Sequence, residues 1–499
     1  MLKVFKNVSK KLKDAKRRFP ENLGEVIVIN TIIVIGSFLY LKTRFQYIND
    51  MVPLWYTKPW GNTQLAEKSL LFIMPGLMLS LLIIGVWLSI ITKKRLFRFS
   101  EILIYYVITL ANILLTFSLV RIIFKASTTF NPLIEPLYLE MLVPFVFSLG
   151  LAYFITPRFI KFAKSRDLVT DPAVHKHPGM LLKQPAVRGG GIVFSIAFLI
   201  TVIIFIPISK EVVGVLTTVM LTAIIGLMDD YANTNPNYKL KFAGNPLIRL
   251  FILLPIAVLP ILMSGVQTDI IGNPFNGALI LNSFKLQAGS LTIAPVAILF
   301  TFLWILWVMN MLSWSNGIDG QYSGIVGIAA IVIAILALRL INIEPEQEQA
   351  AKIAAVLAGA SLGILPYNWH PSKILWGFGA MSAGAVIASL SIITRAKIAT
   401  SIIVLLIPFL DGSFTVLRRI LQKKAPYKGD KGHLHHLLLR RGWSVKKTAI
   451  FYWISTAILG VIGIVSAEKD TPLVILTLGG IVAFFILSVN MSPLSKEKK

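Results

Sequence analysis

The residues best suited to chemistry lie in a basic, histidine-containing loop from Lys428 to Leu437. This loop places His433, His435 and His436 together, and they are three of only six histidines in 499 residues. Arg418 belongs to the same polar segment. Histidines beside arginines can hold a diphosphate and stabilise charge during phosphoryl transfer. The loop therefore predicts phosphate chemistry, with contact between basic residues and lipid headgroups as the alternative.

A pair of adjacent carboxylates forms the second candidate. Asp229 and Asp230 end an otherwise apolar run, and Lys239 follows shortly after them. Paired acids at a membrane interface suit a divalent cation, since Mg²⁺ prefers carboxylate oxygens together with substrate phosphates. The alternative is a solvated helix end.

The segment from Asn310 to Gly320 carries further polar oxygens. It follows an apolar run and carries amide, hydroxyl and carboxylate oxygens on side chains spaced three residues apart. These groups could bind a hard cation or form hydrogen bonds with a sugar. A turn capped by Asn and Gly is the alternative; it explains Gly317 and Gly320 well, and Asp319 less well.

Two more polar segments interrupt the apolar sequence. Arg188 is followed by three glycines, residues 189–191, which allow close approach between the backbone and a phosphate. A flexible basic connector would have the same composition. The segment 366–380 leads into a run rich in Gly and Ala, which indicates closely packed helices.

The composition indicates the kind of structure that must position these residues. The chain is 56% hydrophobic and 14% charged, with a mean hydropathy of +0.75, and a soluble globular domain would be far more polar. We predict an all-α polytopic membrane protein of about fourteen helices, three of them amino-terminal and eleven in a carboxy-terminal bundle. The apolar runs are centred near Val34, Leu81, Ala111, Phe147, Leu199, Leu221, Pro255, Phe302, Ile331, Val356, Ala385, Leu405, Thr456 and Gly479.

The charge pattern predicts the orientation in the membrane. The first apolar run follows a basic stretch and lacks a small-residue cleavage site, so we expect a retained helix and a cytoplasmic amino terminus. If the helices alternate, the basic loops, all five polar segments and the carboxy terminus lie in the cytoplasm, as in a multi-pass protein of the cell membrane. The net charge of +26 then reflects topology and anionic lipid rather than nucleic acid. The absence of cysteine excludes disulfides and thiolate metal sites.

From about Tyr138 to Met491, the order and spacing of these segments resemble the polyprenyl-phosphate N-acetylhexosamine-1-phosphate transferases, glycosyltransferase family 4. The form His433-Leu434-His435-His436 is more similar to the N-acetylglucosamine-1-phosphate branch than to the muramoyl-pentapeptide branch. The resemblance implies a bundle of ten or eleven membrane helices over residues 138–491. Residues 1–130 then form a separate membrane module without assigned chemistry, and residues 492–499 a basic cytoplasmic tail.

The resemblance also implies an activity. It is the transfer of N-acetylhexosamine 1-phosphate, foremost N-acetylglucosamine 1-phosphate, from a UDP-sugar to undecaprenyl or another polyprenyl phosphate, releasing UMP and initiating cell-envelope glycan synthesis. The cofactor would be Mg²⁺, or Mn²⁺ in its place; the partners would be the lipid, the UDP-N-acetylhexosamine and the membrane, and a homodimer is allowed. Asp229, Asp230 and Asp319 would be catalytic and metal-binding, with one of the adjacent pair deprotonating the lipid phosphate. The implied substrate-binding residues are Arg188, Lys239, Asn310, Asn316, Arg418, His433, His435 and His436.

The sequence departs from the family pattern at three positions. Phe378 stands where the family has a metal-binding aspartate, and Ser313 and Asn316 stand where it usually has asparagine and aspartate. Losing two acids weakens a Mg²⁺ site, because the cation relies on anionic oxygen ligands. A protein that binds lipid phosphate or nucleotide sugar without turnover is therefore an alternative. A transporter is a third, but it would need ionisable residues within helices rather than at their ends.

Overall fold

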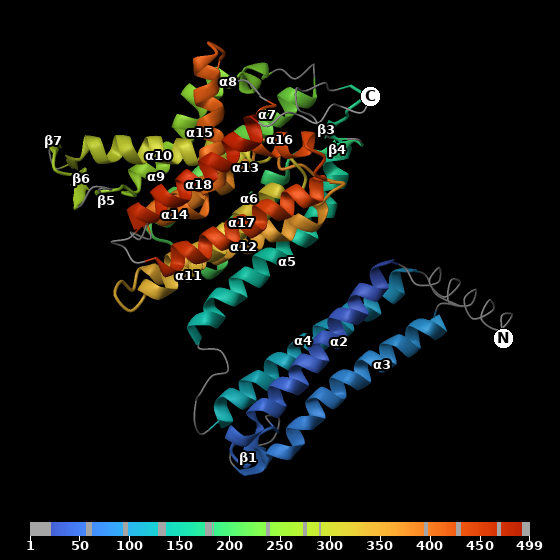
Figure 1. Ribbon diagram of the computed structural model, residues 1–499. Coiled ribbons are helices and arrows are strands. Elements are labelled where there is room, and N and C mark those ends of the chain that lie inside the picture. The colour runs from blue at the N-terminus through green and yellow to red at the C-terminus, as the bar shows by residue number, and fades with distance from the viewer. Residues whose placement is uncertain are drawn as a thin grey trace. The chain divides into compact units, whose positions relative to one another are not determined.

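The protein is divided into two compact units, Met1–Glu135 and Pro136–Lys499, each described here by itself. Both are helical, with short two-stranded hairpins (Figure 1). The structure, a computed structural model, describes residues 21–55, 62–92, 98–127, 136–174, 182, 184–235, 240–272, 277–288, 291–393, 398–425, 431–466 and 471–491. The predicted basic stretch at the amino terminus and the basic tail 492–499 lie outside these residues.

The first unit is built from three long helices, α2 (Glu21–Arg44), α3 (Ile73–Thr92) and α4 (Arg98–Ala126). Strands β1 (Met51–Pro53) and β2 (Leu65–Glu67) form an antiparallel hairpin between α2 and α3, with the short helices η1 (Phe45–Tyr47), η2 (Asn62–Gln64) and η3 (Lys68–Phe72). The buried Asn112 donates to Asn30 Oδ1 at 2.9 Å, and Asn30 donates to Thr109 at 2.8 Å. Such side-chain bonds tie α2 to α4 where both helices are otherwise apolar.

The second unit holds most of the helices. Its central members, α11, α12 and α13, are rich in Ala, Gly and Ser, and small side chains allow helices to approach closely. Its helices are α5 (Pro136–Lys164), α6 (Gly190–Phe205), α7 (Lys210–Thr234), η4 (Lys241–Gly244), α8 (Pro246–Ile248), η5 (Arg249–Leu253), α9 (Leu254–Met263), α10 (Pro295–Trp314), α11 (Gln321–Leu340), α12 (Gln347–Asn368), α13 (Ala380–Ile393), α14 (Ile398–Val404), α15 (Leu406–Leu421), α16 (Leu434–Arg440), α17 (Val445–Val465) and α18 (Thr471–Met491).

These lengths confirm an all-α, multi-pass membrane protein, but not the number of fourteen spans. Among the described residues, ten helices are long and apolar enough to cross a membrane, or eleven if the bent pair α14 and α15 is one span. Helices α6 and α13 have only 16 and 14 residues, fewer than the roughly 20 that a spanning helix needs.

One predicted helix centre is wrong. Leu405 was expected in the middle of a run, but it is the break between α14 and α15, whose axes differ by 84°. The cause is Pro408, because a proline has no N–H to donate to the carbonyl of Val404, four residues back, and its ring crowds that carbonyl.

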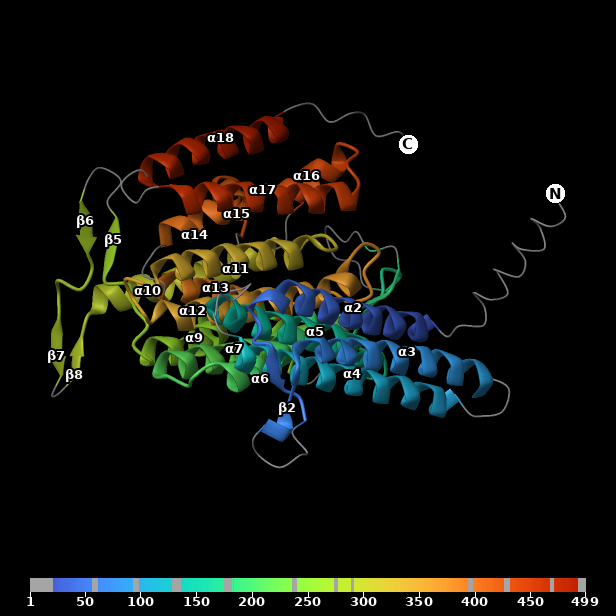
Figure 2. The ribbon, with the colours of Figure 1, turned by 90° about the horizontal axis from the view of Figure 1, so that it is seen from below.

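The two ends of the second unit differ in structure. The hairpins β5 (Ile270–Gly272) with β6 (Ala278–Ile280), and β7 (Leu286–Ala288) with β8 (Leu291–Ile293), lie at one end of its helices. The hairpin of β3 (Val169–Thr170) and β4 (Ala186–Val187) lies with α16 at the opposite end (Figures 1 and 2).

A glycine junction fixes that second end. Gly191 of α6, Gly226 of α7 and Gly379 meet so closely that a Cβ on Gly191 would lie 2.2 Å from a backbone atom of Gly379. The backbone of Leu375 also donates to Val187 of β4 at 2.7 Å. The start of α6, the end of α7 and the turn before α13 are thereby held together.

Candidate active site

The five polar segments found in the sequence meet at this end of the second unit. Arg188 forms an ion pair with Asp230 at 3.3 Å, and the backbone N–H of Phe378 donates to the same carboxylate at 3.2 Å. Asn316 donates to the carbonyl of Gly377 at 3.4 Å. These contacts join four segments that are far apart in the sequence.

The histidine loop joins the same assembly through Gly317. This glycine lies against the ring of His435, where an added Cβ would be 2.0 Å from Nε2. The rings of Trp314 and His433 also lie near each other, with centroids 6.5 Å apart and planes tilted by 42°. All five segments therefore lie side by side, although their chemical roles stay predictions.

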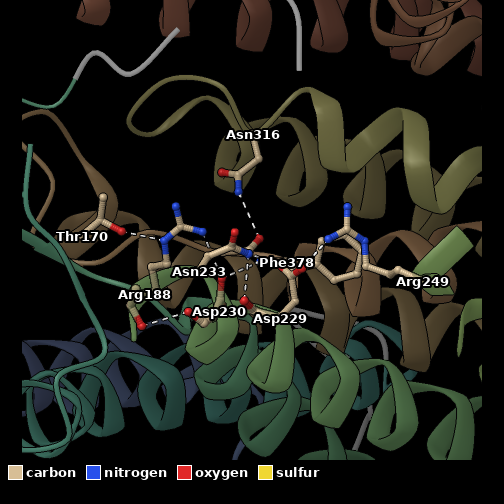
Figure 3. Close-up of polar contacts among 10 residues, drawn as sticks. Thr170, Arg188, Asp229, Asp230, Asn233, Arg249, Asn316 and Phe378 are labelled. Carbon is tan, nitrogen blue, oxygen red and sulfur yellow. Dashed lines mark hydrogen bonds and ion pairs between the residues drawn. The ribbon is translucent and has the colours of Figure 1, made fainter. Parts of the chain in front are cut away.

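Two arginines hold the paired aspartates (Figure 3). Asp229 and Asp230 are 3% and 0% exposed. Asp229 forms an ion pair with Arg249, and its other oxygen accepts from Asn233 at 3.0 Å. Arg188, which pairs with Asp230, is anchored in turn by a 2.6 Å bond from its Nε to a threonine hydroxyl of β3.

Phe378 lies between these charged groups. The Arg249 guanidinium stacks on the Phe378 ring, 3.8 Å from the ring centroid, in a cation–π contact. The residue that replaces the expected aspartate thus supports an arginine that already binds Asp229. Both carboxylates are neutralised by guanidinium groups of the chain itself.

The side chains present do not fit a Mg²⁺ or Mn²⁺ site. Asp230 Oδ2 is buried and faces Gly377, where an added Cβ would lie 2.0 Å from it, so no hydrated ion can approach that oxygen. Within the described ranges, no group of three or more His, Cys, Asp or Glu side chains is arranged to hold a metal. The cation stays a prediction of the resemblance, and we derive no step through it.

Asp319 was predicted as a third catalytic and metal-binding residue, but its carboxylate is occupied elsewhere. Oδ2 lies 2.6 Å from Nδ1 of His370 and accepts from the backbone N–H of Ser372, while Oδ1 accepts from the Ser372 hydroxyl at 2.8 Å. In these contacts Asp319 fixes the turn that leads to Gly377. No described contact joins it to the two buried aspartates, and its catalytic and metal-binding role stays a prediction.

The histidine loop is organised by Asp411. Its carboxylate accepts from the backbone N–H of Leu434 at 2.7 Å and lies 3.0 Å from His433 Nδ1. His433 precedes α16 with an extended backbone, so it does not share a helix face with His436, and its ring stacks in parallel on His435, with ring centroids 5.6 Å apart. An extended residue does not follow the helical period.

Burial decides the charge of this loop. It lowers the pKa of His436 to about 4, helped by the nearby His433, and it lowers the pKa of His435 well below the ordinary value. His435 and His436 are therefore neutral near pH 7 and can each accept and donate one hydrogen bond.

The remaining predicted residues are less directly placed. Arg418 donates to the carbonyl of Gly432 at 3.2 Å, beside the histidines. Asn310 donates to Leu306 of its own helix at 2.7 Å, and no described contact brings it to the aspartates. Lys239 lies outside the described residues.

Arg249 is the main residue that we did not predict. It is the sole charged residue in the apolar stretch from Pro246 to Met263. An ionisable residue in such a stretch is a functional candidate by default, and this signal could have identified it.

An apolar groove of about 460 Å³ shares helix α7 with the charged cluster, although Arg188, Asp229, Asp230 and Arg249 are not among the residues that line it. It lies between the first half of α6 and the second half of α7, and the two aspartates belong to that half of α7. The groove is lined by Ile192, Ser195, Ile196, Leu199, Met220, Ala223, Ile224, Leu227, Met228, Tyr231 and Asn235.

Several known proteins are similar to this chain in sequence. A model of the family described as "Glycosyl transferase family 4" matches residues 212–395. The "Probable undecaprenyl-phosphate N-acetylglucosaminyl 1-phosphate transferase" of Bacillus subtilis is 25% identical over 368 residues, which are 72% of this chain and 94% of that protein. The "Decaprenyl-phosphate N-acetylglucosaminephosphotransferase" of Mycolicibacterium smegmatis is 26% identical over 39% of this chain and 54% of that protein. The "Phospho-N-acetylmuramoyl-pentapeptide-transferase" of Caldanaerobacter subterraneus is 26% identical over 65% of this chain and 97% of that protein.

Proposed function

Because the chain belongs to glycosyl transferase family 4 and is a multi-pass membrane transferase, we propose that it transfers a sugar 1-phosphate to polyprenyl phosphate. The sugar phosphate is N-acetylhexosamine 1-phosphate, with N-acetylglucosamine 1-phosphate as the first candidate, and UMP is released from the UDP-sugar. The product would begin cell-envelope glycan synthesis at the cytoplasmic face of the cell membrane.

The presence of an apolar groove and the charged cluster on the same helix, α7, is the observation that carries this proposal. A polyprenyl phosphate has a long apolar tail and an anionic head. The groove between α6 and α7 offers apolar side chains along its length, and Arg188 comes two residues before α6 begins. Met228 and Tyr231 line the groove directly beside the two aspartates in the sequence. A tail in the groove would therefore bring the phosphate to the guanidinium groups.

The reaction needs one bond to form and one to break. A phosphate oxygen of the lipid attacks the β-phosphorus of the UDP-sugar, and the bond from that phosphorus to the bridging oxygen breaks. The electron pair leaves with UMP, and the lipid carries the sugar through a new diphosphate. Arg188 and Arg249 donate hydrogen bonds to phosphate oxygens whose charge changes during this step.

The aspartates act mainly as anchors in this scheme. A phosphate monoester loses its second proton with a pKa of about 6, so at neutral pH most of the acceptor needs no base. Asp229 and Asp230 are nearly inaccessible to solvent, and each orients one arginine. The neutral His436, with Arg418 nearby, would bind the leaving nucleotide, and the buried His435 would support the His436 ring, which it contacts.

Transfer of labelled sugar phosphate tests the proposal. Purified protein is mixed with undecaprenyl phosphate and UDP-N-acetylglucosamine carrying ³²P at the β-position, and the lipid phase is extracted. We expect labelled lipid from the native protein and at least about 100-fold less from Arg188→Gln, because one preorganised donor to a developing charge contributes about that factor. Arg158→Gln is the control, since the described contact of Arg158 is a hydrogen bond to the carbonyl of Phe154 within its own helix, α5. Lipid labelling that is absent with every UDP-sugar tested would refute the proposal.

Binding without turnover is the second candidate, and Phe378 favours it, because this residue stands where the family pattern has a metal-binding aspartate. Calorimetric titration with UDP-N-acetylglucosamine separates the two. Binding together with absent transfer would support the second candidate.

A further inference from the structure

We propose that this site works without a bound divalent cation, and that the guanidinium groups of Arg188 and Arg249 supply the positive charge to the substrate phosphates. The proposal rests on the proposed transferase function and departs from the Mg²⁺ dependence that the resemblance implies. It follows from the way in which Asp229, Asp230, Arg249 and Phe378 contact one another.

The carboxylate oxygens are already used. Asp229 Oδ1 binds Arg249 and its Oδ2 accepts from Asn233; Asp230 Oδ1 accepts from Arg188 and from a backbone N–H. The fourth oxygen, Asp230 Oδ2, is buried against Gly377. Binding of Mg²⁺ would require an ion pair to break, and small octahedral Mg²⁺ also keeps several water molecules that need space.

The charge balance points the same way. Two aspartates and two arginines give a net charge of zero at the centre of the site. Relative to the family pattern, Asn316 and Phe378 remove two negative charges. Removing two negative charges changes the local charge by +2, which is the same change that a bound dication would produce. A neutral site has little net attraction for Mg²⁺, but the remaining N–H groups of Arg188 and Arg249 can still donate hydrogen bonds to phosphate oxygens.

The arginines keep donors for a substrate. Each guanidinium has five N–H groups; the contact with Asp229 uses one of Arg249, and the contacts with Asp230 and Thr170 use two of Arg188. Both side chains are partly exposed, 19% for Arg249 and 18% for Arg188, while the aspartates beneath them are buried. Stacking on Phe378 covers one face of Arg249 and leaves its N–H edge for phosphate oxygens.

Mn²⁺ binding tests the absence of a cation site without relying on activity. Purified native protein and the Arg249→Gln/Phe378→Asp double variant are titrated with Mn²⁺ and followed by electron paramagnetic resonance. The double variant frees Asp229 and adds a third carboxylate. We expect one Mn²⁺ per chain in the double variant and none in the native protein at millimolar Mn²⁺. Stoichiometric binding by the native protein would overturn the proposal.

The transfer reaction tests the role of the arginines. We expect equal rates, within a factor of about two, in EDTA and in Mg²⁺, and a rate at least about 100-fold lower in Arg249→Gln. Arg158→Gln is again the matched control. Transfer that stops in EDTA and returns with Mg²⁺ would overturn the proposal. No transfer in either buffer would refute the proposed function instead, and Mn²⁺ binding would still decide whether the site excludes the cation.

Discussion

Among alanine substitutions of the glycines in the turn before α13, Gly377→Ala should destabilise the site most, for two separate reasons. Gly377 has a left-handed backbone with φ of +65°, which costs an alanine about 1–2 kcal/mol. Its Cβ would also lie 2.0 Å from Asp230 Oδ2, so the carboxylate must move. Movement weakens charge-assisted bonds from Arg188 and Phe378, each worth about 1.5–3 kcal/mol. We expect a total loss of roughly 3–5 kcal/mol in the free energy of unfolding, from these per-contact values.

Gly442→Ala is the matched control for this variant. Gly442 has a similar φ of +84°, but a Cβ there would meet no atom within 4 Å. Its cost is therefore the backbone strain alone, about 1–2 kcal/mol. Denaturant unfolding of both variants in detergent, followed by tryptophan fluorescence, measures the difference, and labelled-lipid formation measures activity. If both variants lose the same free energy of unfolding, or if Gly377→Ala is active, the close packing of Gly377 against Asp230 is not required for the site.

Three further changes test other parts of the site. Asp411→Ala removes the carboxylate that binds the start of α16 and His433, so the free energy of unfolding should fall by about 2 kcal/mol. Calorimetry should also show weaker binding of the UDP-sugar. An unchanged affinity for the UDP-sugar would contradict this role of Asp411. Because burial lowers the pKa of His436 to about 4 from an ordinary value of 6.5, the unfolded chain takes up the proton first as the pH falls, so thermal stability should decline between about pH 6.5 and 4, and less steeply in His436→Gln; parallel pH profiles would contradict it. Ile224→Trp fills the groove and should raise the KM for polyprenyl phosphate about tenfold, because that factor corresponds to the loss of one buried apolar side-chain contact. The KM for UDP-sugar should not change. The control is Ile203→Trp, at an exposed position of α6 outside the groove, which should leave both KM values unchanged.

Local composition was enough to locate the helices and the polar segments. Apolar runs and their charged ends depend on neighbouring residues in the sequence, so the pattern around Asp229 and Asp230 is visible without a structure. The alternation of helices also predicted that the polar segments share one side, and the structure does bring them to one end of the second unit. The bend at Leu405 was missed because we gave too little weight to Pro408.

Partners far apart in the sequence could not be predicted in the same way. The contacts of Arg249 with Asp229 and Phe378 depend on how α7, η5 and the turn before α13 fold against one another. Likewise the resemblance implied that Asp319 shares a cation with the paired aspartates, whereas in the structure its carboxylate contacts His370 and Ser372. Residue types identified the candidate site residues, but the contacts of those residues could be found only from the fold.

Release of UMP is the most direct measurement of the central claim that arginines, without a divalent cation, support sugar-phosphate transfer. Purified protein is incubated in EDTA with UDP-N-acetylglucosamine, with and without undecaprenyl phosphate, and UMP is quantified by chromatography. The account predicts UMP that appears only with the lipid and does not increase when excess Mg²⁺ is added. UMP that appears only after Mg²⁺ is added would contradict it.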